Sequence, residues 1–87
     1  MANFEICFKE SVAKELRQLP KRDIERILKR IDKLKKEPRP TGCEKLSTQE
    51  RYRVCQGNYR IIYEVNDENL IVIVYKVGHR REVYKQL

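Results

Sequence analysis

The chain has 87 residues, of which 40% are hydrophobic and 38% charged, and a formal net charge of +7. This length suits one small domain over residues 1–87. It contains no apolar run near the roughly 20 residues of a membrane span, and we expect no signal peptide. The composition therefore argues against an integral membrane protein and predicts a cytoplasmic protein attracted to polyanions.

The cysteine and histidine content does not predict a metal site. Cys7, Cys43 and Cys55 are far apart in the sequence, and His79 is the single histidine. Structural zinc sites need closely spaced Cys and His ligands, so neither a metal nor another cofactor is predicted. Cysteines stay free in a reducing compartment, and free cysteines are usually buried within the fold. We therefore expect three buried or half-buried thiols.

Residues 3–19 predict a strand followed by a helix. Apolar residues alternate over residues 3–8, which is the period of a half-buried strand. From residue 9 to residue 19 the apolar residues follow helical spacing instead, with Ser11 as a candidate N-cap.

A second helix is predicted from about Pro20 to Leu34. Five apolar residues follow helical spacing there, and prolines at positions 38 and 40 prevent its continuation. With almost no loop between them, the two helices form a hairpin. The outer face of the second helix carries five cations: Arg22, Arg26, Lys29, Arg30 and Lys33. This row is either a solvated helix surface or a docking surface for a phosphate backbone.

Three consecutive strands are predicted after a polar connection over residues 39–50. Residues 52–56 and 59–65 flank Gly57-Asn58, a pair typical of two-residue hairpins. Residues 70–77 are almost continuously apolar, which indicates a central strand covered on both sides. The order β-α-α-β-β-β predicts an α+β fold, with the helical hairpin packed on one face of a small antiparallel sheet.

Arginines occur within these strands, although a buried arginine without a partner is costly. Period-two alternation places Arg53 and Arg60 on one side of their hairpin, and Arg80 and Tyr84 follow the last strand. We therefore expect these four residues to cluster on the sheet face opposite the helices.

Such a cluster suits cleavage of RNA by its own 2′-hydroxyl group. Arginine holds phosphate bidentately and stabilises developing negative charge, a role open to Arg60 and Arg80. Tyr84 can act as the general base, because neighbouring cations lower the pKa of a tyrosine. Arg53 or His79 would assist the leaving oxygen, and no metal ion is required. Arginines on strands and a histidine at a strand end are also compatible with purely structural roles.

These residues also resemble a known family. The run Tyr-Arg-Val-x-x-Gly-Asn-Tyr-Arg-Ile-Ile-Tyr-Glu at 52–64 and the run Val-Gly-His-Arg-x-Glu-Val-Tyr at 77–84 are similar to the RelE/ParE superfamily of toxins from bacteria and archaea. The helix at 19–34 and the lead-in at 38–46 fit as well, so the resemblance covers essentially the whole chain. It implies one RelE-like domain with the microbial RNase-like fold.

In the RelE branch, the resemblance implies a ribosome-dependent, metal-independent endoribonuclease that cleaves messenger RNA in the ribosomal A site. Arg60, Arg80 and Tyr84 match catalytic residues of that branch. Arg53 stands where well-known members carry a lysine, and Cys55 stands where they carry a second lysine. The absence of this second lysine is a departure from the family pattern. His79 or Arg81, which we expect to bind RNA, would substitute for the missing cation.

The resemblance also implies partners besides the ribosome. The family's toxins are usually covered by an antitoxin, so we expect an acidic, partly disordered partner that orders on binding and an oligomer formed through it. Two other functions stay open: a ParE-like toxin that poisons DNA gyrase without a nuclease site, and a non-catalytic RNA-binding module. The joint presence of Arg60, Arg80 and Tyr84 favours the nuclease over the ParE-like toxin.

Overall fold

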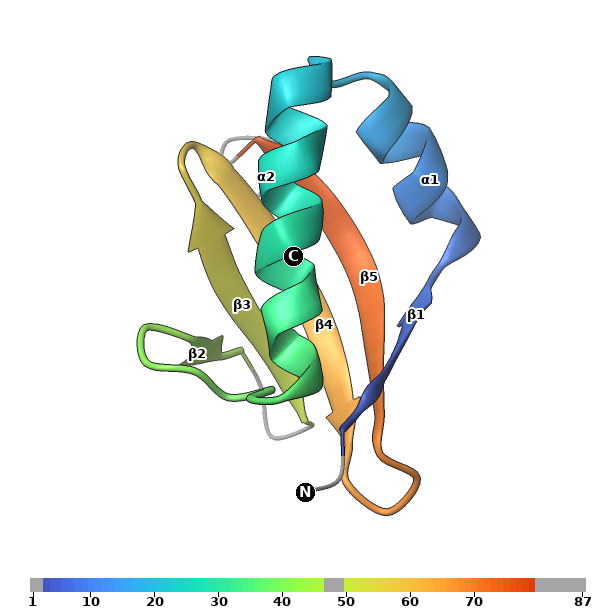
Figure 1. The fold of residues 1–87 in the computed structure, drawn as a ribbon, viewed down its shortest axis with the longest axis vertical. Helices are drawn as coiled ribbons and strands as arrows, with labels where there is room; N and C mark the ends of the chain where they lie inside the picture. Colours follow the sequence, from blue (N-terminus) through green and yellow to red (C-terminus); the bar gives the residue numbers. More distant parts are fainter. Residues whose placement is uncertain (1–2, 47–49, 80–87) are drawn as a thin grey trace.

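The computed structural model describes residues 3–46 and 50–79. In chain order these form β1 (Glu5–Phe8), α1 (Glu10–Arg17), α2 (Lys21–Asp32), a 3₁₀ turn η1 (Lys33–Lys35), β2 (Glu44–Lys45), β3 (Arg51–Gln56), β4 (Tyr59–Asn66) and β5 (Ile71–His79). The strands make one sheet in the order β1-β5-β4-β3-β2. Both helices lie on one side of this sheet, α2 across its front and α1 beside β5 (Figure 1), which confirms the predicted α+β fold.

The strands β3, β4 and β5 form the antiparallel arrangement that the alternating pattern predicts. Gly57-Asn58 connects β3 to β4. Gly57 has a φ of +60°, a value that a two-residue hairpin requires at its first central position and that glycine adopts without a steric penalty. This hairpin fixes which residues of β3 and β4 face each other, and with them the position of Arg60.

Two strand pairings lie outside the sequence prediction. β1 pairs with β5 in parallel, so the sheet is not entirely antiparallel. β2 pairs with the start of β3 at the sheet edge, within the stretch predicted to be an unstructured polar connection. An alternating pattern identifies a strand and its buried face, but it does not identify the neighbour that the strand pairs with.

The core lies between the helices and the near face of the sheet. It contains Val12, Ile27, Ile31, Leu34, Tyr52, Val54, Ile61, Tyr63, Val65, Val72, Val74 and Val77. Full burial of each aliphatic side chain contributes about 1.5–3 kcal/mol to folding. The predicted helical periodicity is confirmed by Ile27 and Ile31 of α2 and Leu34 of η1, which are all buried.

The first helix is held to the sheet by a carboxylate. Glu15 accepts hydrogen bonds from the backbone N–H of Val77 at 3.2 Å and from Lys76 Nζ at 2.6 Å. β1 covers β5 only between Ile71 and Val74, so Glu15 provides a hydrogen-bond acceptor for the edge of β5 beyond the end of β1.

The predicted N-cap of α1, Ser11, is wrong. Lys9 occupies the cap position and makes no side-chain cap hydrogen bond.

β5 carries one extra residue opposite β4. Tyr63 pairs with Val74 and Ile62 pairs with Lys76, so Tyr75 between them has no ladder partner in β4. Because successive strand residues point to opposite faces, one extra residue exchanges the two faces for the rest of the strand. This bulge decides where the side chains after Tyr75 point.

Two of the three thiols differ from the prediction. Cys43 is half-buried as expected, but Cys7 and Cys55 are exposed, because both lie on strand positions that face away from the core.

In the described parts of the chain, no helix combines the length and the apolar character needed to cross a membrane.

Candidate functional site

The sheet face opposite the helices carries a row of arginines. Arg51 and Arg53 alternate along β3 with Tyr52 and Val54, which are buried in the core. Their side chains therefore project from the sheet face that is turned away from α2. In Figure 1, α2 lies in front of the sheet, so this face is at the back. We call Arg51, Arg53 and Arg60 the arginine face.

The strand register brings Arg53 and Arg60 to the same face, as predicted. Arg60 lies directly across from Cys55, and Arg53 directly across from Ile62. Arg53 and Arg60 are therefore diagonal neighbours on one face, a relation that places Cα atoms about 7–8 Å apart. On its other side Arg60 lies across from Gly78 of β5, so three strands meet at this point.

The side chain of Arg60 is only partly satisfied. Its Nη1 donates to the carbonyl oxygens of Tyr59 at 3.2 Å and Gly57 at 3.4 Å. Its Nε is buried and donates to no partner in the described residues. A buried donor without an acceptor costs free energy, and such an atom in a native structure calls for an explanation, such as a catalytic role or a bound water or ion.

Arg51 repeats this arrangement and was missed by the sequence prediction. Its Nε is also buried without a partner among residues 3–46 and 50–79, and its guanidinium carbon lies 4.5 Å from the ring centre of Tyr75, a cation–π contact. The signal was present in the sequence, because Arg51 has the same parity as Arg53 in an alternating strand.

Arg53 is more strongly paired than Arg60. It forms an ion pair with Glu44 of β2, across the β2–β3 pairing. Its side chain is 16% exposed. Because this carboxylate neutralises part of its charge, Arg53 contributes less free positive charge to the arginine face than Arg60 does.

His79 lies on the opposite face of the sheet from Arg60. The bulge at Tyr75 turns His79 toward the helices, where its ring meets Tyr59 edge-on with centroids 6.2 Å apart. The Tyr59 hydroxyl donates to Asp23 of α2 at 2.8 Å, and this hydrogen bond raises the pKa of Tyr59. The structure therefore separates His79 from Arg53 and Arg60, whereas the sequence prediction grouped them.

The other predicted site residues lie outside the described part of the chain. These are Arg80, Arg81 and Tyr84, which come after the end of β5 at His79 in the sequence. Their predicted roles stay predictions.

A network of hydrogen bonds around a single arginine, which we call the Arg39 cluster, lies at the other end of the sheet. Arg39 donates to Asp67 through Nη1 at 3.0 Å and Nη2 at 2.7 Å, to Glu50 at 2.8 Å, and through Nε to the Tyr52 hydroxyl at 2.8 Å. The Tyr52 hydroxyl donates to Glu50 as well. Together the Tyr52 hydroxyl and the Arg39 guanidinium lower the pKa of Glu50 to about 2.

Within residues 3–46 and 50–79, no three His, Cys, Asp or Glu side chains are gathered in a way that could hold a metal ion. The described arginines supply fixed cations, which bind phosphate and stabilise negative charge.

Comparison with known proteins shows the class of protein to which this chain belongs. The family model described as the ParE toxin of type II toxin–antitoxin systems, parDE, matches residues 6–84. The chain therefore belongs to the RelE/ParE superfamily of type II toxins.

Individual relatives lie in the RelE branch of that superfamily. The RelE1 protein of Methanocaldococcus jannaschii is 31% identical, over 94% of this chain and 96% of that protein. Toxin RelG of Mycobacterium tuberculosis is 25% identical, over 95% and 98%. A variant of E. coli toxin RelE in the free state superposes with a TM-score of 0.81 at 30% identity, over 98% of this chain and 93% of that one. RelE in the archaeal RelE–RelB complex from Pyrococcus horikoshii gives a TM-score of 0.78 at 28% identity, over 90% and 96%.

Proposed function

We propose that this toxin is a ribosome-dependent endoribonuclease that cleaves messenger RNA in the A site without a catalytic metal ion. The observation that carries the proposal is the buried Nε of Arg60, which has no hydrogen-bond partner among residues 3–46 and 50–79, on a face that also presents Arg51 and Arg53. Partly desolvated guanidinium groups with unused donors are suited to an oxyanion that carries extra charge in the transition state.

In the proposed reaction, the 2′-oxygen of one nucleotide attacks its own 3′-phosphate. Tyr84 takes the proton from the 2′-hydroxyl, and Arg60 and Arg80 stabilise the negative charge on the pentavalent phosphorus. The bond to the 5′-oxygen of the next nucleotide breaks, and that oxygen takes up a proton. The products are a 2′,3′-cyclic phosphate and a 5′-hydroxyl end.

The remaining basic residues have supporting roles in this proposal. Arg53 shares a face with Arg60, which supports a role in holding the phosphate beside the leaving oxygen. His79 lies on the other face, so RNA that contacts it must pass the end of the sheet. Arg81 substitutes for the cation that is absent at Cys55, which is exposed directly across from Arg60.

The partner that controls this activity is proposed to be an antitoxin. RelE forms a complex with RelB in Pyrococcus horikoshii, and an E. coli RelE variant binds a peptide of its antitoxin RelB. With a net charge of +7, this chain suits an acidic partner that neutralises the arginine face, in an oligomer held together by the antitoxin. Because the proposed activity requires the ribosome, we propose that the toxin acts in the cytoplasm.

The test is cleavage of a defined message on programmed ribosomes. The unmodified, antitoxin-free protein is compared with Arg80→Ala and Tyr84→Phe, with the same message without ribosomes as the control. We expect one cut in the A-site codon that requires the ribosome and slows by at least about 100-fold in either variant. A folded protein that leaves the message intact would overturn the proposal.

The alternative is inhibition of DNA gyrase, because the matching family model is described as a ParE toxin. A gyrase poison needs neither the buried Nε of Arg60 nor a general base at Tyr84. It predicts that the protein blocks supercoiling by purified gyrase and that the variants Arg60→Ala and Tyr84→Phe remain equally inhibitory. The same preparation would leave ribosome-bound messages uncut.

A further inference from the structure

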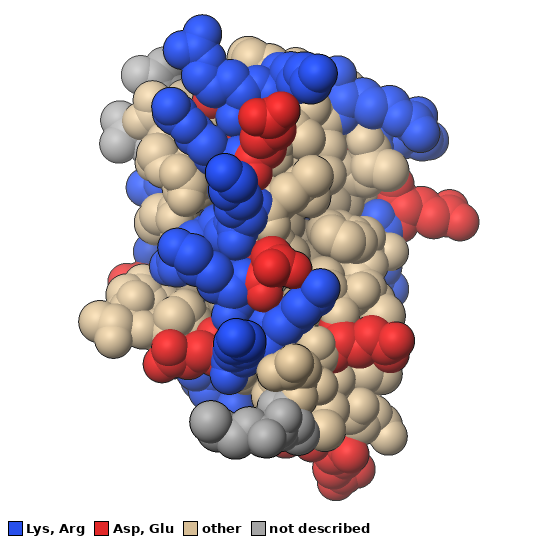
Figure 2. Space-filling view, viewed as in Figure 1, with Lys and Arg blue, Asp and Glu red and all other residues tan. Residues whose placement is uncertain are grey.

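Two basic side chains on the back of the sheet are held against one aromatic ring. The guanidinium carbon of Arg51 lies 4.5 Å from the ring centre of Tyr75, and Nζ of Lys9 lies 4.9 Å from the same centre. In the view of Figure 2, by contrast, the Lys and Arg side chains of the helix side extend into solvent beside Asp and Glu side chains. We call Lys9, Arg51 and Tyr75 the Tyr75 clamp, because the ring brings two positive charges close together.

The clamp joins three segments of the sheet. Arg51 is the first residue of β3, Tyr75 is the extra residue of β5, and Lys9 follows the end of β1. The backbone N–H of Lys9 donates to the carbonyl oxygen of Val74 at 3.0 Å, which fixes Lys9 beside Tyr75. All three clamp residues lie outside the sequence motifs that carry the resemblance to the toxin family. The clamp is therefore a feature of this chain that the resemblance does not predict.

The clamp retains positive charge. The Tyr75 hydroxyl donates to Glu64 of β4 at 3.1 Å, which holds the ring in place. Glu64 also lies directly across from Arg51, but within residues 3–46 and 50–79 neither Arg51 nor Lys9 forms an ion pair with a carboxylate. Nε of Arg51 is buried and has no hydrogen-bond partner in that part of the chain. Two cations and one carboxylate are gathered here, which leaves a net positive charge and unused donors.

The chemistry of the clamp fits a phosphate group. A guanidinium group that stacks on a ring keeps its N–H donors in its own plane, where they match two oxygens of a phosphate. The ammonium group of Lys9 binds phosphate as a point charge. Because two cations already contact the Tyr75 ring, the ring orients these cations and is not an open platform for stacking a nucleobase.

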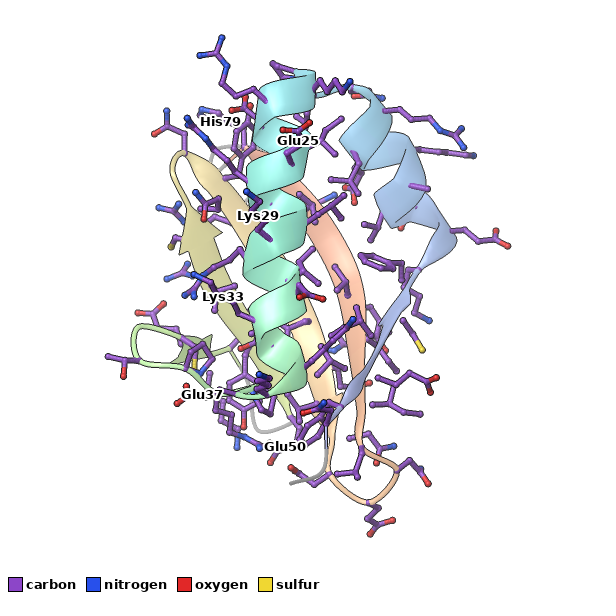
Figure 3. All side chains as sticks on the ribbon, in the orientation of Figure 1. Glu25, Lys29, Lys33, Glu37, Glu50 and His79 are labelled. Atoms are coloured by element: carbon purple, nitrogen blue, oxygen red, sulfur yellow. The ribbon has the colours of Figure 1, made fainter. Side chains whose placement is uncertain are left out.

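The clamp lies on the same face as Arg60 but nearer the other end of the sheet. Arg60 lies across from Cys55, which is four residues, or about 13 Å, along β3 from Arg51. Figure 3 shows Glu50, the chain neighbour of Arg51, and His79, which follows the residue paired with Arg60, toward opposite ends of the molecule. One phosphate does not reach both sites, whereas a strand of RNA that lies along this face contacts both through different phosphates.

We propose that the Tyr75 clamp binds a second, uncut phosphate of the message whose scissile phosphate lies at Arg60. The inference rests on the proposed function, because it places both phosphates on one RNA strand along the arginine face. Phosphate contacts position a nucleic acid without reading its sequence. The clamp residues are therefore positioning residues, which hold the message in place and take no part in breaking the bond.

The experiment measures single-turnover cleavage on programmed ribosomes over a range of protein concentrations, which gives a half-saturating concentration and a maximal rate. The clamp variant carries Lys9→Gln and Arg51→Gln. The matched control carries Lys14→Gln and Arg17→Gln, which removes the same two charges from exposed positions of α1. Thermal unfolding of each variant verifies that it is folded.

We expect the clamp variant to need about tenfold more protein for half-saturation, because two charged contacts to phosphate are lost. Its maximal rate should stay within about threefold of the unmodified protein, since a positioning contact acts mainly on binding. The control should match the unmodified protein. If the clamp variant does not fold, the single variant Lys9→Gln, at an exposed position, should raise the half-saturating concentration by about threefold.

A second series identifies the phosphate that the clamp holds. Each message carries one methylphosphonate linkage, which removes the charge of a single phosphate. At one uncut position this change should raise the half-saturating concentration of the unmodified protein by about tenfold. The same linkage should add nothing in the clamp variant, because the cations that contact it are already absent. Contacts between the message and the ribosome are the same for both proteins and cancel in this comparison.

Three results would overturn the inference. They are equal behaviour of the clamp variant and the control, methylphosphonate effects that add to those of the clamp variant at every position, and a lower maximal rate with unchanged half-saturation. Any of these in a preparation whose unmodified protein cuts the message defeats the inference alone. If the unmodified protein leaves the message uncut, the proposed function fails and the inference falls with it.

Discussion

At the end of the sheet where β3 begins, the guanidinium group of Arg39 donates to Tyr52, Glu50 and Asp67. At the other end, beside the β3–β4 hairpin, the Nε of Arg60 is buried and donates to no described residue. Both arginines belong to the same small basic domain and differ mainly in their partners. An arginine whose donors are all used stabilises the fold, whereas a buried donor without a partner among the described residues is available to a ligand.

The largest expected effect comes from Arg60, which lies on the arginine face. Arg60→Ala should slow cleavage on programmed ribosomes by about 100–1000-fold, because it removes a donor that we propose to stabilise the transition state. Arg60→Lys should recover part of this loss, since lysine keeps the charge but not the bidentate geometry. The cleavage rate under single-turnover conditions measures both, and an unchanged rate in Arg60→Ala would remove the arginine face from the mechanism.

An intermediate effect is expected from Arg39, and on stability instead of cleavage. Its side chain is 36% exposed, so the loss of its ion pairs in Arg39→Ala should lower the free energy of unfolding by about 1 kcal/mol. For a domain of this size that corresponds to a decrease in Tm of about 4–8 °C. Calorimetry measures the shift, and the cleavage rate below the transition should equal that of the unmodified protein. A large loss of cleavage with no change in Tm would show instead that Arg39 acts in cleavage and not in stability.

The smallest effect concerns acid stability at the Arg39 cluster. The pKa of Glu50 is lowered from 4.5 to about 2 in the folded chain. A lowered carboxylate pKa contributes stability above the unfolded value, and that stability is lost as the pH falls toward the folded value. Between about pH 4.5 and pH 2, the Tm of the unmodified protein should therefore fall more steeply than that of Glu50→Gln. Parallel curves over this range would show that Glu50 makes no such contribution.

The local elements of this fold follow from the sequence, because each is specified by its own periodicity and turn residues. The two helices and the β3–β4–β5 arrangement are confirmed in this way. The parallel pairing of β1 with β5 and the short β2 depend on contacts between distant segments. No local pattern encodes these contacts, so the sequence does not predict them.

The candidate site shows the same division. Arg53 and Arg60 share a face because the Gly57-Asn58 hairpin fixes their register, and this relation could be predicted. The side on which His79 lies depends on the single extra residue at Tyr75. Strict alternation from Val72 and Val74 would place His79 with the arginines, and the bulge reverses that assignment. A bulge is a property of the strand pair, and the continuous apolar run of β5 conceals it.

The central claim, that the message is cut by attack of its own 2′-hydroxyl with arginines in place of a metal ion, can be tested on the substrate. After the cut has been mapped, a second message carries a single 2′-deoxy nucleotide immediately 5′ of the scissile phosphate. Ribosomes, Mg²⁺ and protein are the same for both messages. The account predicts that the cut at this position disappears while the all-ribose message still yields a 2′,3′-cyclic phosphate end. Cleavage of the deoxy message at the same position and rate would show that water or another nucleophile attacks the phosphate, and would contradict the account.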